Sequence, residues 1–257
     1  MKPGLIICLP LLLAACQYVP LTGRSQLQMI SEGAEAGLGL SAYQDVLKKE
    51  KISHDPALND LVTRVGSRIA AATGKTGYQW EFRVIDNDKL ANAFCLPGGK
   101  VAVYTGILPL TRDEAGLAAV IGHEVAHAIA RHGGERMSQQ LLLEGISFAA
   151  AASAKDERRA NLYATMLGVG ATFGILLPYS RLHESEADRL GLIYMAKAGY
   201  DPRAAQDFWT RMAAHDGKKG KPPAWMSTHP GDEQRIRQIE RWLPEALSYY
   251  RPHPAQP

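Results

Sequence analysis

The sequence of 257 residues contains little cysteine, with only Cys8, Cys16 and Cys95. No spacing between them matches a zinc ribbon, and so few thiols exclude a disulfide-rich scaffold. Aromatic residues are scarce, at 7%, and the formal net charge is only +3 at pH 7. No stretch combines basic and aromatic side chains, so we expect no nucleic-acid partner. Hydrophobic residues make up 46% of the chain, which suffices to bury a sizeable core.

The N-terminus has the pattern of an export signal. Residues 5–13 form an apolar stretch that is too short to span a bilayer comfortably. The small residues before Cys16 resemble the cleavage box of bacterial lipoproteins, although a plain secretory signal with an incidental cysteine is the alternative. We expect a signal peptide over 1–15, lipidation of Cys16 with attachment to a membrane, and a tether over 16–30. Because Gln17 rather than aspartate follows, the pattern favours the outer membrane, facing the periplasm.

Hydrophobic periodicity predicts an α+β fold that is mostly helical, with a small sheet beside the central helix. The folded domain is expected over 31–245 and a disordered tail over 246–257. The sheet comes from three short alternating stretches before residue 106, and a Thr-x-x-Glu box at Thr111 predicts the start of the central helix. Strands are predicted at 80–86, 91–96 and 100–105, helices at 31–51, 56–69, 111–131, 181–198, 202–215 and 232–243, and a basic loop at 216–223.

The central helix carries His123, Glu124 and His127 in the order H-E-x-x-H. Residues four apart on a helix lie on one face, so both imidazoles can bind one metal ion. Glu124 lies beside the ligand face, where a carboxylate can act as base for a water molecule. This pattern predicts a catalytic zinc site, and a chance match on a buried helix is the alternative.

Two histidines leave a catalytic zinc site short of its usual three protein ligands. His132 lies near the motif, but the long metzincin pattern needs glycine at position 130 and histidine at position 133. The chain has Ala130 and Gly133 there, so this pattern excludes His132 as the third ligand.

A better third ligand lies in the helical stretch 181–191. Glu184 and Asp188 are four residues apart and share a face. Glu184 can reach the metal while Asp188 accepts a hydrogen bond from the outer nitrogen of a liganding histidine. We expect Glu186 to point elsewhere into solvent and His183 to be a flanking residue.

The pair H-E-x-x-H and E-x-x-x-D resembles the gluzincin family, which includes the heat-shock protease HtpX and the CAAX prenyl proteases. The similarity is greater to its soluble, lipid-anchored periplasmic branch and runs from about Asn92 to Arg235. It includes the segments Asn92-Ala93-Phe94, Pro97-Gly98-Gly99 and Thr228-His229-Pro230.

This resemblance implies a fold and a set of site residues. One zinc ion per chain would be bound by His123, His127 and Glu184, and Glu124 would be the general base. Such a site hydrolyses peptide bonds, so the resemblance implies a gluzincin-type zinc metalloendopeptidase.

Three further residues take roles only from the resemblance. Asn92 would hold the substrate backbone, and the strand before the metal-binding helix could pair with an extended substrate or be a purely structural hairpin. His229 and Arg235 would lie at the active site, where matching histidines can occupy the open zinc position in resting enzymes. Cys95 stands where alanine is expected, which is a mild departure from the family pattern.

An uncharged stretch over 160–180 lies between the two metal motifs. Its length is close to the ~20 residues that cross a bilayer, but a single crossing would separate His123 from Glu184. Three interpretations remain: a membrane hairpin with 141–154, helices packed over the site, or contact with a membrane surface.

The resemblance implies that the enzyme hydrolyses misfolded or misassembled envelope proteins, as protein quality control. Its partners would be those unfolded substrates and an outer-membrane assembly machinery. One alternative is a chaperone-like assembly factor that uses the same cleft without proteolysis. A structural zinc protein is a second alternative, which would need a fourth permanent ligand. An intact Glu124 favours the enzyme, because holding a peptide needs no base.

Overall fold

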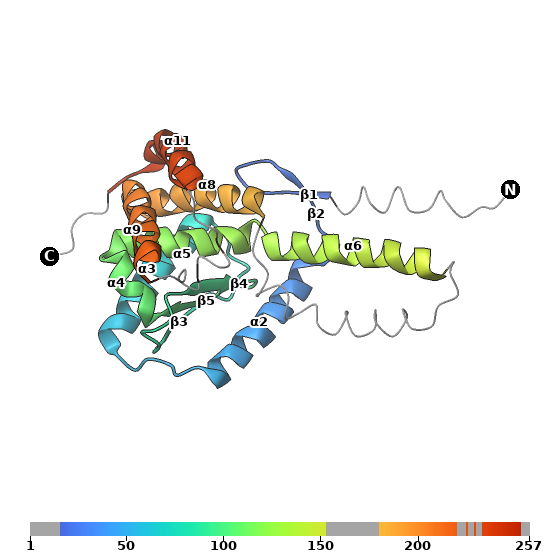
Figure 1. Cartoon of the computed structure of the whole chain (residues 1–257), viewed down its shortest axis with the longest axis horizontal. Helices are drawn as coiled ribbons and strands as arrows, with labels where there is room; N and C mark the ends of the chain where they lie inside the picture. The colour runs from blue at the N-terminus through green and yellow to red at the C-terminus, as the bar shows by residue number, and fades with distance from the viewer. Residues whose placement is uncertain (1–15, 153–179, 220–224, 226–228, 230–232, 253–257) are drawn as a thin grey trace.

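The computed structural model describes residues 16–152, 180–219, 225, 229 and 233–252 (Figure 1). Helices predominate around one three-stranded sheet, which confirms the α+β, mostly helical prediction. The elements are β1 (Cys16–Tyr18), β2 (Ser25–Leu27), α2 (Glu32–Lys49), α3 (Pro56–Thr73), β3 (Glu81–Ile85), β4 (Ala93–Leu96), β5 (Lys100–Tyr104), the 3-10 turn η1 (Thr105–Ile107), α4 (Leu108–Thr111), α5 (Glu114–Ile129), α6 (His132–Ala152), α8 (Arg181–Lys197), α9 (Arg203–Lys219) and α11 (Glu233–Tyr249).

The three predicted strands form one sheet in the order β3-β5-β4. β3 and β5 are parallel, whereas β4 and β5 are antiparallel and joined by a tight turn. Gly98 and Gly99 in that turn both have φ of +86°, a conformation that glycine adopts without steric cost. Within the described ranges, no strand pairs with the outer edge of β4, and β4 lies against α5.

Helix α5 is buried almost all round, because it lies between the sheet on one side and α8 on the other (Figure 1). Helices α5 and α8 cross at two glycines, Gly122 on α5 and Gly191 on α8. A Cβ atom on Gly191 would lie 2.9 Å from the backbone nitrogen of His123. The two helix backbones therefore touch, and ligand side chains placed on either helix are brought to one point.

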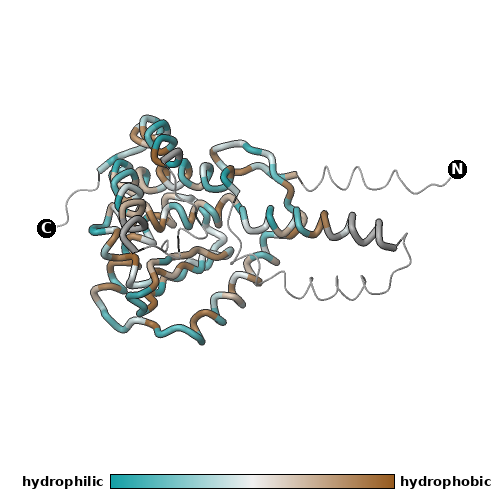
Figure 2. The backbone as a smooth tube through the Cα atoms, viewed as in Figure 1, coloured by the Kyte–Doolittle hydropathy of each residue, from teal (hydrophilic) through white to brown (hydrophobic). Residues whose placement is uncertain are grey.

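The outer helices are amphipathic, as hydrophilic and hydrophobic residues alternate along α2 and α11 (Figure 2). Asp55 caps α3 by accepting hydrogen bonds from two backbone N–H groups, and Pro56 occupies its first turn. Both features follow the sequence prediction.

The predicted capping box at Thr111 is wrong. The Thr111 hydroxyl donates to the carbonyl of Leu108 and ends the short helix α4. Asp113 instead caps α5, with its carboxylate accepting from the N–H of Gly116. An acidic cap at the start of α5 also stabilises the positive end of the helix dipole.

The predicted tether over 16–30 is also wrong, since β1 and β2 form a small antiparallel hairpin against the end of α5. Val19 is only 1% exposed. The side-chain amides of Gln26 and Gln28 donate to the carbonyls of Ala130 and Arg131. The hairpin is held mainly by polar contacts, which hydrophobic periodicity cannot detect.

The C-terminal boundaries also differ from those predicted. Helix α9 extends to Lys219, into the expected loop, and α11 continues through Pro244 to Tyr249, into the expected tail. Ala246 is fully buried, and Glu245 accepts two hydrogen bonds from Arg189 of α8. These contacts hold the last turns of α11 against the body, and residues 253–257 lie outside the described part.

Among the described residues, none of the helices combines the length and apolar character that a bilayer crossing needs. The three interpretations of the stretch 160–180 fall outside the described residues, apart from Ser180. That residue caps α8, with its hydroxyl accepting from the N–H of His183.

Candidate metal centre

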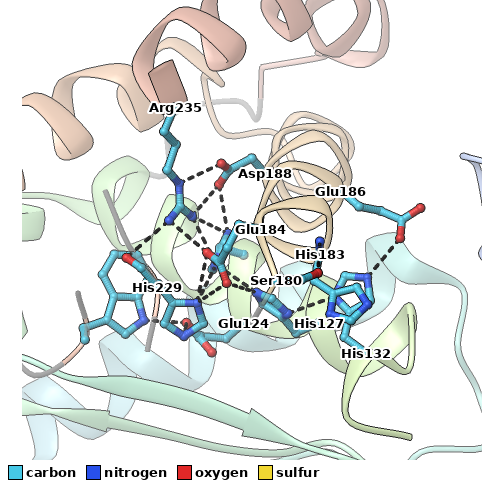
Figure 3. Close-up of polar contacts among 12 residues, drawn as sticks. Glu124, His127, His132, Ser180, His183, Glu184, Glu186, Asp188, His229 and Arg235 are labelled. Atoms are coloured by element: carbon cyan, nitrogen blue, oxygen red, sulfur yellow. Dashed lines mark hydrogen bonds and ion pairs between the residues drawn. The ribbon is translucent and has the colours of Figure 1, made fainter. Parts of the chain in front are cut away.

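Four side chains converge between α5 and α8. His123 and His127 come from α5 and Glu184 from α8, while His229 comes from the chain before α11. Each is at most 5% exposed, and one potential ligand atom from each lies within 4.8 Å of all the others. The three ligands proposed from the sequence therefore meet His229, which is distant from them in the sequence. Figure 3 shows His127, Glu184 and His229 pointing toward one another.

The donor atoms have the spacing of a tetrahedral metal site. Nε2 of His123 lies 3.1 Å from Nε2 of His127 and 3.1 Å from Nδ1 of His229. Glu184 oxygens lie 3.5, 3.4 and 3.0 Å from these three nitrogens in the same order. Zn–N bonds of about 2.0–2.1 Å at tetrahedral angles put ligands about 3.3 Å apart. Three imidazole nitrogens cannot all donate to one another, so a cation suits this arrangement.

Burial and charge determine the protonation of these groups. Burial opposes the charged form of Glu184, but His229 and Arg235 hold the pKa of its carboxyl well below the usual range. Burial lowers the pKa of His127 well below its ordinary value. For His123, burial and Arg235 oppose protonation, but hydrogen bonds to Asp188 and Glu184 raise its pKa to about 9. A metal ion would displace that proton on binding.

Asp188 contacts His123 directly. Its Oδ1 lies 2.9 Å from Nδ1 of His123, which is the side of the ring that faces away from the ligand cluster. Arg235 donates to both oxygens of Asp188 at 2.7 Å and lies 2.9 Å from Glu184. The spacing of Glu184 and Asp188 thus puts one carboxylate among the ligands and the other behind a ligand.

His127 has an equivalent contact on its outer side, but through a second imidazole. Nδ1 of His132 lies 2.9 Å from Nδ1 of His127, and Nε2 of His132 lies 3.0 Å from Glu186 (Figure 3). Burial lowers the pKa of His132 to about 4, which keeps the ring neutral at pH 7. The expectation that Glu186 is solvated is wrong, as it is 7% exposed and hydrogen-bonded.

Glu124 lies beside the ligands and is covered by Trp225. The indole Nε1 donates to Oε1 of Glu124 at 2.6 Å, and the same oxygen lies 3.4 Å from Nε2 of His229. The backbone N–H of Trp225 donates to the carbonyl of Ala91, just before β4. Trp225 and His229 therefore occupy the space next to the expected base.

Of the remaining predicted residues, Arg235 lies at the centre, whereas Asn92 and Cys16 are described by other contacts. Three nitrogens of Arg235 approach carboxylates of α8, and its guanidinium lies 3.4 Å from the ring centre of Trp209. Asn92 immediately precedes β4, and its carbonyl accepts from the N–H of Tyr104. Cys16 is exposed at the start of β1, and its lipidation stays a prediction.

Sequence reasoning missed several residues that contact the site without being proposed as ligands. His132 and Glu186 were considered but assigned no contact, while Trp225 and Trp209 were not considered. His132 begins α6, beyond the end of α5, so spacing along one helix gave no signal for its contact with His127.

Two histidines and a glutamate around one point, with a second glutamate beside them, define a zinc-dependent peptidase of the H-E-x-x-H type. Comparison of the sequence with protein families agrees. The family model for peptidase family M48 matches residues 56–243, and the chain belongs to this family. It is a metalloendopeptidase, and zinc is the metal that the family uses.

Named relatives fall into two groups. The mitochondrial metalloendopeptidase OMA1 of Schizosaccharomyces pombe is 42% identical over 233 residues, covering 90% of this chain and 67% of the relative. Human mitochondrial metalloendopeptidase OMA1 is 32% identical over 89% of this chain and 46% of its own length. A putative beta-barrel assembly-enhancing protease of Vibrio cholerae is 34% identical over 76% of this chain and 41% of the relative. The chain thus spans about two thirds of the fission yeast relative and less than half of the human and Vibrio cholerae relatives.

These relatives correct two expectations. The resemblance to HtpX and the CAAX prenyl proteases is confirmed as membership of family M48, but the relatives are OMA1 and beta-barrel assembly-enhancing proteases rather than a lipid-anchored branch specifically. The expected location at the outer membrane, facing the periplasm, is contradicted, because mitochondrial OMA1 proteases from yeasts and human align with most of the chain.

Proposed function

We propose that this metalloendopeptidase cleaves unfolded or misassembled envelope proteins as a quality-control enzyme. The observation that carries the proposal is the convergence of His123, His127, Glu184 and His229 beside Glu124. The names of the relatives support the substrate class, since one group is named for the assembly of beta-barrels.

In this proposal His123, His127 and Glu184 hold zinc. Bound there, zinc would polarise the peptide carbonyl and lower the pKa of a water molecule. Glu124 would take the proton of that water during attack on the carbonyl and return it to the leaving amine. Its carboxylate lies beside the ligand cluster, next to Nε2 of His229.

His229 would be the fourth ligand of the resting site. Its Nδ1 has the same spacing to His123 and Glu184 as the other donors have to one another. The side chain is 3% exposed, so water and substrate reach the ligand position only after His229 moves. Trp225 would also have to move, because its indole covers Glu124. Its backbone N–H is bonded to the carbonyl of Ala91, just before the strand expected to bind substrate.

The outer edge of β4 would bind the substrate in extended form. This edge pairs with no strand in the described part of the chain and lies against α5, which carries the H-E-x-x-H residues. An added substrate strand would place its backbone beside Asn92 and its scissile bond toward the ligands.

The decisive experiment compares wild type with Glu124→Gln on an unfolded model protein such as casein. We expect one zinc ion per chain in both proteins and a loss of cleavage of about 10²–10⁴-fold in the variant, as general acid–base catalysis contributes that much. Metal analysis and appearance of cleaved fragments are measured on the same preparations. Undiminished cleavage by the zinc-loaded variant would refute the mechanism. Protection of unfolded protein from aggregation without cleavage by wild type would favour the assembly-factor alternative.

A further inference from the structure

Arg24, at the end of the turn between β1 and β2, is partly buried and makes ion pairs with two buried carboxylates. Its Nε lies 2.8 Å from Oε2 of Glu186, and its Nη2 lies 2.7 Å from Oε2 of Glu135. Both carboxylates are at least 93% buried. Arg24 thus joins the N-terminal hairpin to α6 through Glu135 and to α8 through Glu186.

From Glu186 the contacts continue to a metal ligand. The same carboxylate oxygen that accepts from Arg24 lies 3.0 Å from Nε2 of His132, and Nδ1 of His132 lies 2.9 Å from Nδ1 of His127. We call Arg24, Glu186, His132 and His127 the support chain. Figure 3 shows Glu186 leaving α8 away from Glu184 and toward His132.

In the support chain, each hydrogen bond can have its donor on only one side. Nε2 of His127 faces the other ligands, so its proton sits on Nδ1 and is donated to Nδ1 of His132. His132 then carries its proton on Nε2 and donates it to Glu186. Glu186, being charged, accepts from Arg24 as well. The position of each proton is thereby fixed, which holds the imidazole of His127 in the tautomer that a metal needs.

The hairpin gives Arg24 a fixed position relative to α5. The amides of Gln26 and Gln28 bind the last carbonyls beyond α5, at 2.9 Å from Ala130 and 3.0 Å from Arg131. His127 lies in the last turn of the same helix. Both ends of the support chain are therefore attached to one short segment of backbone.

A second branch fixes the neighbouring imidazole. Glu135, the other partner of Arg24, lies 3.0 Å from Nε2 of His183, and the rings of His183 and His132 are stacked with centroids 4.4 Å apart. Removing Arg24 would leave Glu135 and Glu186 as buried carboxylates with less compensation, so both would shift toward other partners.

We propose that Arg24 is a positioning residue of the metal centre, which keeps zinc ligand His127 oriented through Glu186 and His132. The N-terminal hairpin is then part of the metal centre, although none of its residues is a ligand. The inference rests on the ligand set of the proposed function, and a His127→Ala protein tests that set separately.

The test measures zinc affinity by competition with a chromophoric chelator in the full chain. We expect Glu186→Gln to weaken zinc binding by about 10–100-fold and Arg24→Gln by about tenfold, within the range for groups behind metal ligands. Arg24→Lys keeps the charge and recovers part of the affinity. The control is Arg189→Gln on α8, which removes a similar two-bond pair with Glu245 away from the centre and leaves zinc affinity unchanged.

Two further measurements separate positioning from general loss of stability. The visible absorption of the Co²⁺-substituted protein should change in Arg24→Gln and stay the same in Arg189→Gln, because it reports ligand geometry. Adding Arg24→Gln to Glu186→Gln should weaken zinc binding little further, as the support chain is already broken. Wild-type zinc affinity and Co²⁺ spectrum in Arg24→Gln, or fully additive effects in the double variant, would overturn the proposal. Unchanged zinc binding in His127→Ala would instead refute the ligand set.

Discussion

Glu184 and Glu186 are two residues apart on α8, yet they contact the two faces of the same metal centre. Glu184 lies among the ligand atoms, whereas Glu186 lies behind His127 and His132. A step of two residues turns a helix by about 200°, so the two carboxylates leave it on nearly opposite sides. One turn of helix thereby supplies both a ligand and the support for another ligand.

A prediction at the residue scale concerns His229. We expect His229→Ala to keep zinc, because three protein ligands remain, and to cleave an unfolded protein several-fold faster, because the fourth position stays open. Zinc content and initial rates of casein cleavage provide the measurement. Slower cleavage at full zinc occupancy would mean that His229 supports the transition state instead of closing the site.

Among the elements, the crossing of α5 and α8 controls the distance between ligands. A Cβ on Gly191 would lie 2.9 Å from the nitrogen of His123 and 3.0 Å from the carbonyl carbon of Gly122. Both are backbone atoms, so neither can move aside as a flexible side chain would. The helices must separate to accept even one methyl group.

We therefore predict that Gly191→Ala destabilises the protein by about 1–3 kcal/mol, as overpacking usually does, and also weakens zinc binding. Gly37→Ala is the matched control, because its Cβ would meet no atom within 4 Å inside helix α2. That variant should gain up to about 1 kcal/mol from helix propensity. Thermal unfolding and chelator competition on both variants test this. Normal zinc affinity in Gly191→Ala would show that the crossing does not set the ligand spacing.

The elements that sequence reasoning located well are those with a continuous apolar pattern or a strong cap. The three strands and α3 lie where periodicity, Asp55 and Pro56 placed them. The β1–β2 hairpin was not predicted because each strand has three residues and its contacts are mostly polar. Helix α11 continues past the predicted end at residue 243, through Pro244 to Tyr249, and Ala246 in this last part is fully buried.

At the site too, the sequence predicted some features and missed others. Which residues share a helix face was predictable from spacing, as with His123 and His127 on α5 or Glu184 and Asp188 on α8. Contacts between elements were not, because spacing along a chain does not tell which elements meet in space. His229 reached the list of candidates only through family resemblance, and Trp225 had no signal of its own.

At the scale of the whole molecule, the buried ion pairs around Arg24 affect acid stability. Burial opposes the charged form of Glu135, but hydrogen bonds from His183 and Arg24 lower its pKa from about 4.5 to about 2. A carboxyl whose pKa is lowered by folding contributes its full stabilisation at pH values above the pKa that it has in the unfolded chain. Its contribution is lost as pH falls from about 4.5 toward 2.

We thus expect Glu135→Gln to be less stable than wild type at pH 7, with the difference shrinking as pH falls from about 4.5 toward 2. Denaturant unfolding in the presence of a chelator measures this, since acid also removes zinc. Glu245→Gln is the control, because its carboxylate is one-third exposed and its side chain pairs with Arg189. If the free energies of unfolding of wild type and Glu135→Gln differed by the same amount at pH 7 and at pH 3, the stabilisation would not come from the charged Glu135 carboxylate.

Trp225 gives the closed site an optical signature. Its indole is fully buried, bonded to Glu124 and stacked 4.8 Å from Trp209, among only 4 tryptophans in the chain. Displacement of Trp225 by a substrate would break the stack and expose the ring to water, shifting its fluorescence to longer wavelength. Trp225→Phe should abolish most of that shift. The protein therefore carries an intrinsic probe for the rate at which its active site opens, without any added label.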